Sequence, residues 1–308
     1  MSDAVELFER PEADEKIMFV GWRQWADAGS MSSGLPQYLI QLIGARKIGN
    51  IKPDGFYLFQ FPGTHDLIRP VIKFEDGMPI SLEAPRNELY FGESDGRGIV
   101  IFVGDEPHFS VERYIDSILE AARTLGVGRI IGFGGVYGEL PYDRERLVSG
   151  IYSLPHLKGE LNDLSVNLSD YQGGASIGAY LCKRAGEQGI EFLSFYAFVP
   201  TYEFSGITQA GSSIRIENDH KAWYDVLRRV SHMQQLNLDL SDLEEKSARL
   251  MEALDSKVEE LDQSSPQLGV RDYMNKLSDR FSELAFDPLE EVWEDELRRL
   301  SDKFDLEE

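Results

Sequence analysis

The chain has 308 residues, 42% of them hydrophobic, and its formal charge is −23, from 54 acidic and 31 basic residues. This length and apolar content suffice for one large α/β domain with an extension. The acidic charge repels phosphate backbones and anionic bilayers, which argues against nucleic-acid and membrane partners. No apolar run is long enough to cross a membrane, and the N-terminus lacks the apolar region of a secretory signal. The single cysteine, Cys182, suits a reducing compartment. We therefore expect a cytoplasmic protein.

The first third of the chain predicts one strand, one helix and then several short strands. Residues 17–22 ("IMFVGW") indicate a buried strand, and residues 31–45 indicate a helix with its leucines on one face. Residues 55–61 ("GFYLFQF") predict a second strand. Three closely spaced β-like pieces follow, and their spacing predicts an antiparallel excursion over residues 69–94.

The middle of the chain predicts a regular alternation of strands and helices. A strand at 98–104, a helix at 110–125 and a strand at 129–135 form a βαβ unit, with Ser110 as the helix N-cap and Gly126 as its C-terminal stop. The alternation continues through a strand at 164–168, a helix at 176–188, a strand at 191–200 and a helix at 219–235. Such alternation predicts an α/β sheet covered by helices on both faces.

The last part of the chain differs in composition, and we place a boundary near Asn237, between an α/β domain at 1–236 and an acidic helical extension at 237–308. Residues 239–308 hold 22 acidic and 9 basic residues. Leucines recur there at helical spacing, and Pro266 and Pro288 interrupt the pattern, which predicts two or three amphipathic helices, the third near 292–304. Their apolar faces pack either on the α/β core or on a partner, and we favour the core.

The segment "GGASIG" (173–178) contains the G-x-S-x-G pattern that presents a nucleophilic serine in many hydrolases. A nucleophile elbow needs a strand leading into the motif, whereas the preceding residues, "SDYQG", are polar. The acid and histidine that follow, Asp219 and His220, are adjacent at a helix start. We therefore favour Ser176 as a helix cap over a serine nucleophile, and a glycine-rich helix start that holds an anion is a third interpretation.

Two further loops at predicted strand ends carry candidate chemistry. "GFGGVYG" (132–138) lacks the third glycine and the following helix of a dinucleotide-binding fingerprint, so its glycines more simply allow a tight turn at a strand end. "GDEPHF" (104–109) places acids beside a histidine, which suits metal binding or acid–base work, although the spacing fits no specific metal motif and structural roles are favoured. We predict no metal and no cofactor.

Several segments, in this order, resemble the proteasome assembly chaperone two family over roughly residues 15–235. They are "FVGWRQWADAGS", "RP" at 69–70, "FVGDEP", "LGVGRIIGFGG", "GGASIG" and "AFVPTYE". The resemblance implies a three-layer α/β sandwich akin to the nucleoside phosphorylase/hydrolase-like fold, here with an all-α C-terminal extension similar to that of actinobacterial members. It also implies homo-oligomers, such as trimers, and it brings no established catalytic machinery.

Our candidate binding loops are the loops that match the family. We expect them to meet at one edge of the sheet, because the carboxyl ends of parallel strands lie together there. With Ser176 added, they comprise Asp27, Ala28, Gly29, Gly104, Asp105, Glu106, Pro107, Gly134, Gly135, Gly174 and Gly178.

The chain departs from the family pattern at three places. Many relatives carry a histidine where this chain has Tyr142 and another where it has Thr201, which weakens any histidine-based mechanism. Archaeal relatives often end in a hydrophobic residue, a tyrosine and one further residue, whereas this sequence ends Leu306-Glu307-Glu308, so we do not expect proteasome docking by that route.

Three functions follow from these observations. The first is a non-catalytic, assembly-chaperone-like role with a proteasome-related or other protein client. The alternative is a small-molecule binding protein for nucleoside- or phosphate-like ligands, or a hydrolase- or phosphorylase-like enzyme, with Asp27 and Glu106 as acid–base candidates. The third is a structural oligomer with its helical tails at the interface.

Overall fold

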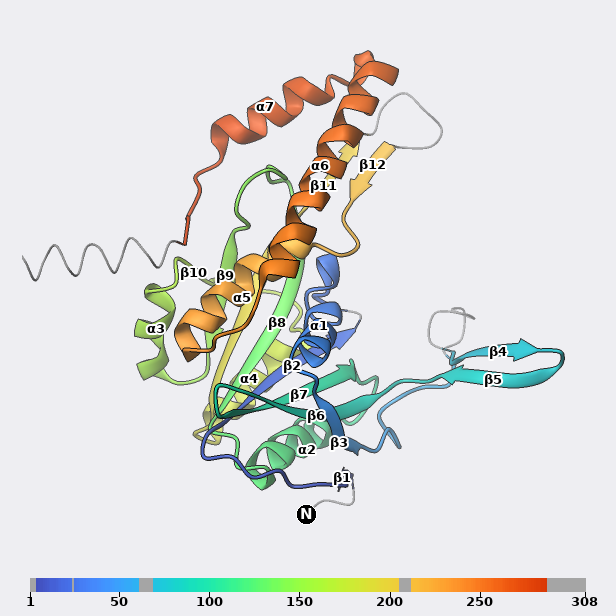
Figure 1. Cartoon of the computed structure of the whole chain (residues 1–308), viewed down its shortest axis with the longest axis vertical. Helices are drawn as coiled ribbons and strands as arrows, with labels where there is room; N and C mark the ends of the chain where they lie inside the picture. The colour runs from blue at the N-terminus through green and yellow to red at the C-terminus, as the bar shows by residue number, and fades with distance from the viewer. Residues whose placement is uncertain (1–3, 24, 61–68, 205–211, 287–308) are drawn as a thin grey trace, which may run out of the picture.

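The fold is a large, strongly twisted mixed β-sheet with helices on both faces, seen in a computed structural model (Figure 1). The structure describes residues 4–23, 25–60, 69–204 and 212–286. Within them, the main sheet runs in the order β1-β3-β6-β7-β2-β8-β11-β9-β10, and β12 pairs with β11. The strands are β1 (Val5–Leu7), β2 (Lys16–Arg23), β3 (Arg46–Ile51), β4 (Val71–Glu75), β5 (Met78–Glu83), β6 (Asn87–Ser94), β7 (Arg97–Asp105), β8 (Arg129–Gly138), β9 (Val148–Tyr152), β10 (Asn167–Leu168), β11 (Glu191–Phe204) and β12 (Ser212–Arg215).

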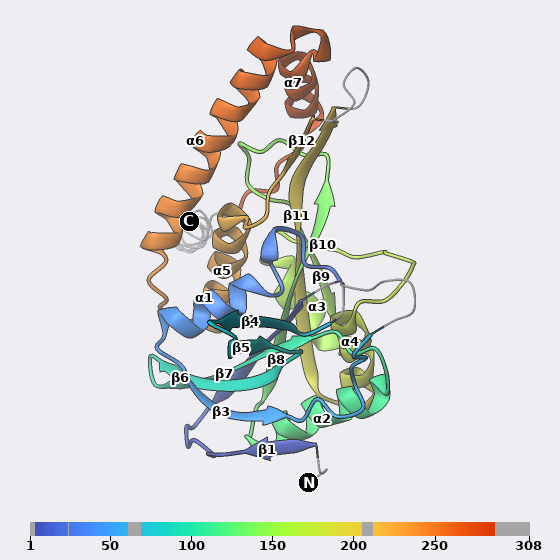
Figure 2. The same ribbon diagram turned by 90° about the vertical axis from the view of Figure 1, so that its right-hand side faces the viewer.

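Helices cover the two faces of this sheet unequally. The α-helices are α1 (Gly34–Leu42), α2 (Val111–Thr124), α3 (Lys158–Asn162), α4 (Ile177–Glu187), α5 (His220–Gln234), α6 (Ser241–Ser264) and α7 (Val270–Arg280). Figure 2 shows α1, α5 and α6 on one side of the sheet and α2 and α4 on the other. The predicted alternation of strands and helices is therefore confirmed as a mixed α/β architecture.

The central strands explain why helices are needed on both faces. β2, β7, β8 and β11 are parallel neighbours, and almost every residue in the middle of each is buried. Alternate residues of β2 enter two different clusters: Phe19 packs with α1 and α5, whereas Met18 and Val20 pack with α2 and α4. A strand buried on both sides reads as a continuous apolar run, which is how "IMFVGW" appears in the sequence.

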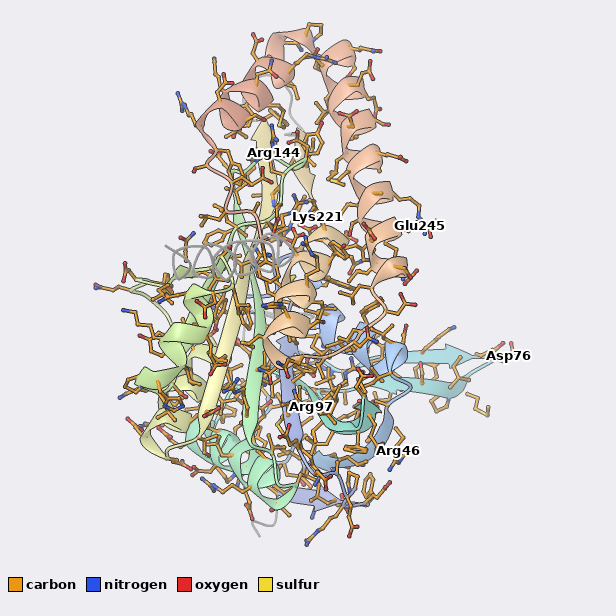
Figure 3. All side chains as sticks on the ribbon, turned by 60° about the vertical axis from the view of Figure 1, so that its left-hand side comes forward. Arg46, Asp76, Arg97, Arg144, Lys221 and Glu245 are labelled. Atoms are coloured by element: carbon orange, nitrogen blue, oxygen red, sulfur yellow. The ribbon has the colours of Figure 1, made fainter. Side chains whose placement is uncertain are left out.

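A two-stranded arm, β4 and β5, leaves this body altogether (Figure 1). The two strands are antiparallel, as predicted for this segment. Their turn is Asp76-Gly77, and both residues have positive φ, the conformation that a two-residue hairpin turn requires and that an Asp-Gly pair favours. Asp76 lies at the tip of the arm, far from the sheet (Figure 3). Every residue of both strands is exposed.

The C-terminal helices pack on the α/β part of the same chain. α6 lies along α5, and its buried residues Leu243, Leu254 and Val258 belong to the same apolar cluster as the sheet residues. α7 adds Val270 and Met274 to that cluster. The preference for the chain's own core agrees with these contacts. The predicted third helix near 292–304 lies outside the described residues.

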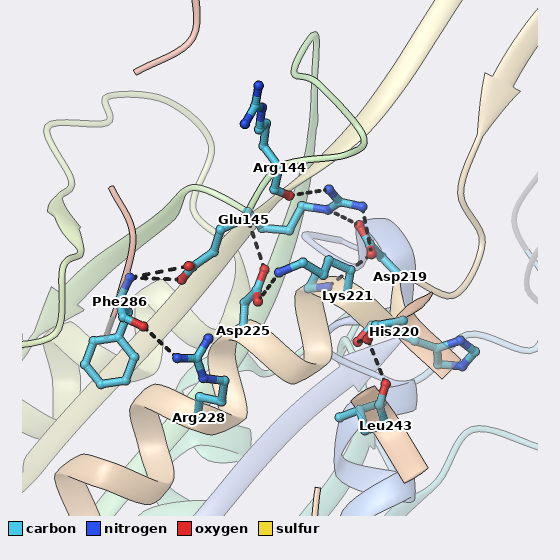
Figure 4. Close-up of polar contacts among 12 residues, drawn as sticks. Arg144, Glu145, Asp219, His220, Lys221, Asp225, Arg228, Leu243 and Phe286 are labelled. Carbon is cyan, nitrogen blue, oxygen red and sulfur yellow. Dashed lines mark hydrogen bonds and ion pairs between the residues drawn. The ribbon is translucent and has the colours of Figure 1, made fainter. Parts of the chain in front are cut away.

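A buried polar network fastens the N-terminal half of α5 to the segment before β9 (Figure 4). Arg146 donates to the Asp219 carboxylate, with Nε 2.8 Å from Oδ2, and its backbone N–H donates to Asp225 at 2.9 Å. Lys221 forms an ion pair with Asp225. The backbone N–H of Phe286 donates to Glu145, so the end of the described chain returns to the same network.

Two local predictions were wrong, and the strand predicted at 164–168 was right only for its last two residues, Asn167–Leu168. Residues 55–60 form a turn and irregular backbone instead of the strand predicted at 55–61, because Phe56 is buried against α2, where its ring centroid lies 5.2 Å from that of Tyr114. Ser110 precedes α2, but it has φ 53° and its side chain makes no capping hydrogen bond. The predicted stop of the same helix is confirmed, since Gly126 has φ 71°.

Within the described residues, no helix is both long enough and apolar enough to cross a membrane.

Candidate functional site

A cavity of about 970 Å³ opens where the carboxyl ends of β2 and β8 and the middle of β11 meet the loop before α4. Open α/β sheets place ligands at this position because adjacent loops diverge there and leave a crevice. The cavity draws residues from six separate parts of the chain. They are Trp25, Ala26, Asp27, Ala28, Gly135, Val136, Tyr137, Ser149, Ile151, Ser169, Tyr171, Gly173, Gly174, Ala175, Ser176, Ala179, Tyr196, Phe198 and Arg215.

The structure brings part of the predicted loop set into this wall. Asp27, Ala28, Gly135, Gly174 and Ser176 line the cavity. The other predicted residues lie outside its lining. They are Gly29, Gly104, Asp105, Glu106, Pro107, Gly134 and Gly178. Three of the four predicted loops therefore converge, and the loop after β7 contributes no lining residue.

The loop after β2 is held by its own acid. Asp27 Oδ1 accepts hydrogen bonds from the backbone N–H groups of Ser32 and Ser33, each at 2.9 Å, directly before α1. Burial raises the pKa of Asp27, and these N–H donors offset part of that effect. The carboxylate therefore accepts the free N–H groups that precede α1, which is a structural role and not that of a catalytic base.

Gly135, a residue of β8, holds the loop after β2 close to that strand. Its N–H donates to the carbonyl of Ala26 at 2.7 Å, and Asp27 forms a parallel bridge with it. A Cβ on Gly135 would lie inside van der Waals contact with the carbonyl oxygen of Ala28. Backbone therefore approaches backbone here at a distance that only glycine permits.

Ser176 is the N-cap of α4, as predicted. Its Oγ accepts a hydrogen bond from the Ala179 N–H at 3.2 Å and lies 3.1 Å from the phenolic oxygen of Tyr196. Neither partner is a general base of the kind that a serine nucleophile needs, because burial raises the pKa of Tyr196 and keeps its phenol neutral. A serine N-cap stabilises a helix by about 1 kcal/mol, which accounts for the residue.

The acid and the histidine that follow Ser176 in the sequence, which we did not expect to form a triad with it, have other contacts. Asp219 caps α5 by accepting from the Ala222 N–H at 3.1 Å, and it pairs with Arg146. The ring of His220 stands edge-on to Trp223, with 5.0 Å between the ring centroids. The acid and the histidine are thus part of the α5 packing and its buried network.

Glu106 occupies the anion position at the start of α4. Its Oε1 accepts the backbone N–H of Ile177 at 2.9 Å, so the chain's own carboxylate meets the positive end of the helix. Burial raises the pKa of Glu106, and this hydrogen bond lowers it by a smaller amount. An external anion at this helix start would have to displace Glu106.

We expect Glu106→Gln to raise the melting temperature at pH 8 and to have progressively less effect towards pH 4. The folded state holds the Glu106 proton more tightly than the unfolded chain does, so the wild type loses stability as pH rises above the ordinary pKa of 4.5. Glutamine keeps an acceptor for Ile177 but does not ionise. Thermal unfolding of both proteins at several pH values measures this difference.

Glu112→Gln serves as the control of opposite sign. Glu112 is an exposed residue at the start of α2, and its hydrogen bond from Arg184 lowers its pKa. Its stabilising contribution is present above its ordinary pKa and lost in acid, so this variant should melt lower at neutral pH. A Glu106→Gln variant that behaves like Glu112→Gln would contradict the assignment.

The "GDEPHF" cluster is engaged in packing contacts. Asp105 pairs with Arg23, with Nε 2.6 Å from Oδ1, and also accepts from the Arg86 N–H at 2.8 Å. His108 Nδ1 accepts the Leu58 N–H at 3.0 Å. These contacts tie β7 to β2 and to the segment around residue 57, in agreement with the structural interpretation of the cluster.

Sequence reasoning missed the aromatic part of the wall. Tyr196 and Phe198 lie on β11, where the strand pattern explained them as core residues, and Tyr171 lies in a polar turn. Arg215 belongs to a strand that was not predicted. A usable signal was present, because aromatic residues at alternate positions of β11 near its centre place both rings on one face of the sheet.

These features define an α/β protein with a twisted, largely parallel central sheet and a cavity at the carboxyl ends of its strands. The model of the PAC2 family matches residues 22–258, and the chain belongs to the PAC2 family. This confirms the family resemblance found in the sequence. A search of the curated proteins finds no match.

Solved structures share the fold at low sequence identity. A Mycobacterium tuberculosis protein of unknown function has a TM-score of 0.72 at 21% identity, covering 91% of each chain. A proteasome-assembly chaperone homologue from the same organism has a TM-score of 0.67 at 22% identity, covering 78% of this chain and 94% of that one. PbaB of Pyrococcus furiosus, an archaeal proteasome activator, has a TM-score of 0.56 at 20% identity, covering 82% and 97%.

Proposed function

We propose that this chain is a non-catalytic, assembly-chaperone-like protein that acts as a homo-oligomer, and that the β4–β5 arm makes its self-contact. The arm is the observation that carries the proposal. Membership of the PAC2 family, and the engagement of Asp27, Glu106 and Ser176 in structural hydrogen bonds, support a binding role over catalysis.

One face of the arm is apolar. Ile72 pairs with Leu82 and Phe74 pairs with Pro79 across the two strands, and directly opposed residues share a face. Phe74 and Leu82 are 56% and 63% exposed. An isolated two-stranded hairpin is marginal in water, and a contiguous exposed apolar face marks a protein interface.

A second copy of the chain is the occupant that we assign to this face. The helical tails, the other interface considered, already bury Leu243, Leu254 and Val258 in their own chain. The arm extends away from the body, so it can reach a neighbouring copy without moving any packed element (Figure 1). In a closed trimer built in this way, the apolar face of each arm is buried against a neighbouring copy.

Solution mass tests this contact. Wild-type protein should show a multiple of 34.9 kDa by light scattering, and Phe74→Glu/Leu82→Glu should reduce it to the single-chain mass because it puts charges on the face that the second copy would bury. Phe8→Glu/Phe109→Glu, at exposed aromatic residues outside the arm, should leave the oligomer intact. A monomeric wild type, or an arm variant of unchanged mass, would refute the proposal.

The client is proteasome-related in this proposal, in line with the assembly and activation roles named for the M. tuberculosis homologue and for PbaB. Tagged wild-type chain purified from its own host should retain proteasome subunits in fixed proportion. Recovery of the chain alone would contradict an assembly role while leaving the self-contact untouched.

The finer points of the architecture belong to the same proposal. They are a three-layer sandwich akin to the nucleoside phosphorylase/hydrolase-like fold, a division at residue 237 between the α/β domain and an acidic extension, and a cytoplasmic location.

A further inference from the structure

The cavity at the strand ends has the size and the aromatic lining of a small-molecule site. Its volume of about 970 Å³ lies at the upper end of the range for small-molecule sites, about 300–1,000 Å³. Five aromatic side chains from four separate segments line it: Trp25, Tyr137, Tyr171, Tyr196 and Phe198. Rings that converge from several elements offer flat surfaces on which a planar molecule can stack.

Hydroxyl groups accompany these rings. Ser149, Ser169 and Ser176 line the cavity, together with the phenols of its tyrosines. Ser176 and Tyr196 lie 3.1 Å apart, and both can donate and accept hydrogen bonds. Such groups suit a ligand that carries several hydroxyl groups or ring nitrogens.

The charges around the cavity disfavour an anionic ligand. Among the lining residues, only Asp27 and Arg215 carry a formal charge, so they offset one another. The guanidinium of Arg215 lies over the Tyr137 ring, 4.4 Å from its centroid, and Glu217 acts on it as a further negative charge. The helix start that could hold a phosphate already holds the Glu106 carboxylate.

The backbone of the cavity wall is held in an unusual conformation. Ala26 lines the cavity with φ 53°, and Ser30 in the same loop has φ 52°. The loop keeps this shape through the Gly135 N–H bond to Ala26 and the Trp223 Nε1 bond to the Gly29 carbonyl at 2.9 Å. Left-handed conformations at non-glycine residues cost free energy and cluster at ligand sites.

From these features we infer that the cavity binds an uncharged nucleoside, a planar heteroaromatic ring with a hydroxylated substituent. The aromatic side chains stack on the ring, and the serine and tyrosine hydroxyls bond its polar groups. The corresponding monophosphate binds more weakly, because Glu106 and Asp27 oppose its charge. This inference does not depend on the self-contact through the β4–β5 arm.

Calorimetric titration with adenosine, guanosine, uridine and AMP tests the inference. At least one nucleoside should bind with a Kd below about 1 mM, and AMP should bind at least about tenfold more weakly than adenosine. Trp25 is 60% exposed in the cavity wall, so stacking of a nucleoside on it should also shift its emission to shorter wavelength, a change that Trp25→Ala should remove.

Variants distinguish the cavity from unspecific binding. Tyr171→Ala and Trp25→Ala should each weaken nucleoside binding about tenfold or more, since both rings are exposed and their loss spares the core. Phe8→Ala removes an equally exposed ring, at 60%, outside the cavity and should leave binding unchanged. The inference fails if none of the three nucleosides binds with a Kd below about 1 mM, if AMP binds as tightly as adenosine, or if the cavity variants behave like Phe8→Ala.

Discussion

Replacing Arg146 with alanine is expected to destabilise the protein by about 3–5 kcal/mol, because it leaves the fully buried carboxylate of Asp219 without its countercharge. Arg146 donates to both oxygens of Asp219, with Nε–Oδ2 and Nη2–Oδ1 distances of 2.8 and 3.3 Å. Asp219 in turn caps α5, against which α6 packs. The substitution should therefore weaken the packing of the C-terminal helices as well as that of the sheet.

Urea unfolding of Arg146→Ala, Asp219→Asn and Arg144→Ala measures this effect. Asparagine keeps an acceptor for the Ala222 N–H but removes the charge, so Asp219→Asn should lose a similar amount by leaving Arg146 unpaired. Arg144 is exposed, and its ion pairs with described residues are long, the shorter at 3.9 Å to Glu283, so its removal should cost less than about 0.5 kcal/mol. Arg146→Ala within about 1 kcal/mol of wild type would contradict the role given to the pair.

Gly135→Ala is expected to destabilise the protein by about 3 kcal/mol, because an added Cβ meets the carbonyl oxygen of Ala28 and backbone cannot yield as a side chain does. The substitution should also push the 26–30 loop away from β8 and break the Gly135 N–H bond to Ala26. Thermal unfolding measures the loss of stability, and amide hydrogen exchange at residues 26–33 reports loosening of the loop.

Gly174→Ala is the matched control for that prediction. Gly174 also lines the cavity, but a Cβ there meets no atom within 4 Å, and its φ is not positive. Alanine should be tolerated within about 0.5 kcal/mol. If both variants are equally stable, the close approach between β8 and the 26–30 loop does not constrain the fold.

Much of the architecture could be predicted because local pattern decides it. Strands buried on both faces read as apolar runs, and helices covering them read as apolar stripes, so the strands β7, β8 and β11 and the helices α2, α4 and α5 lie within a few residues of their predicted positions. The short elements β9, α3 and β12 lack such a pattern and were not predicted. The antiparallel pairing of β4 and β5 was also predicted, because closely spaced β-like pieces leave room only for short turns between them. Ser176 was assigned as a cap because its flanking residues exclude a strand.

The failures have a common cause. Residues 55–61 have the composition of a strand, but burial of Phe56 under α2 outweighed that propensity. Glu106 looked like an acid–base candidate, and its engagement with Ile177, 71 residues later, cannot be seen in local sequence. The aromatic wall of the cavity was missed for the same reason, since its residues are far apart in the chain.

The sequence by itself determined the α/β class, the family and the positions of most strands and helices, because each depends on side-chain periodicity and on residues close together in the chain. Only the tertiary structure decided that Asp27 meets Gly135, that Glu106 meets the start of α4, and that Trp25, Tyr171 and Tyr196 share one cavity. Strand order and crossovers bring these groups together, and a periodic pattern carries no information about which strand lies beside which. The physical reason is that function depends on long-range contacts, whose formation follows from packing the whole sheet.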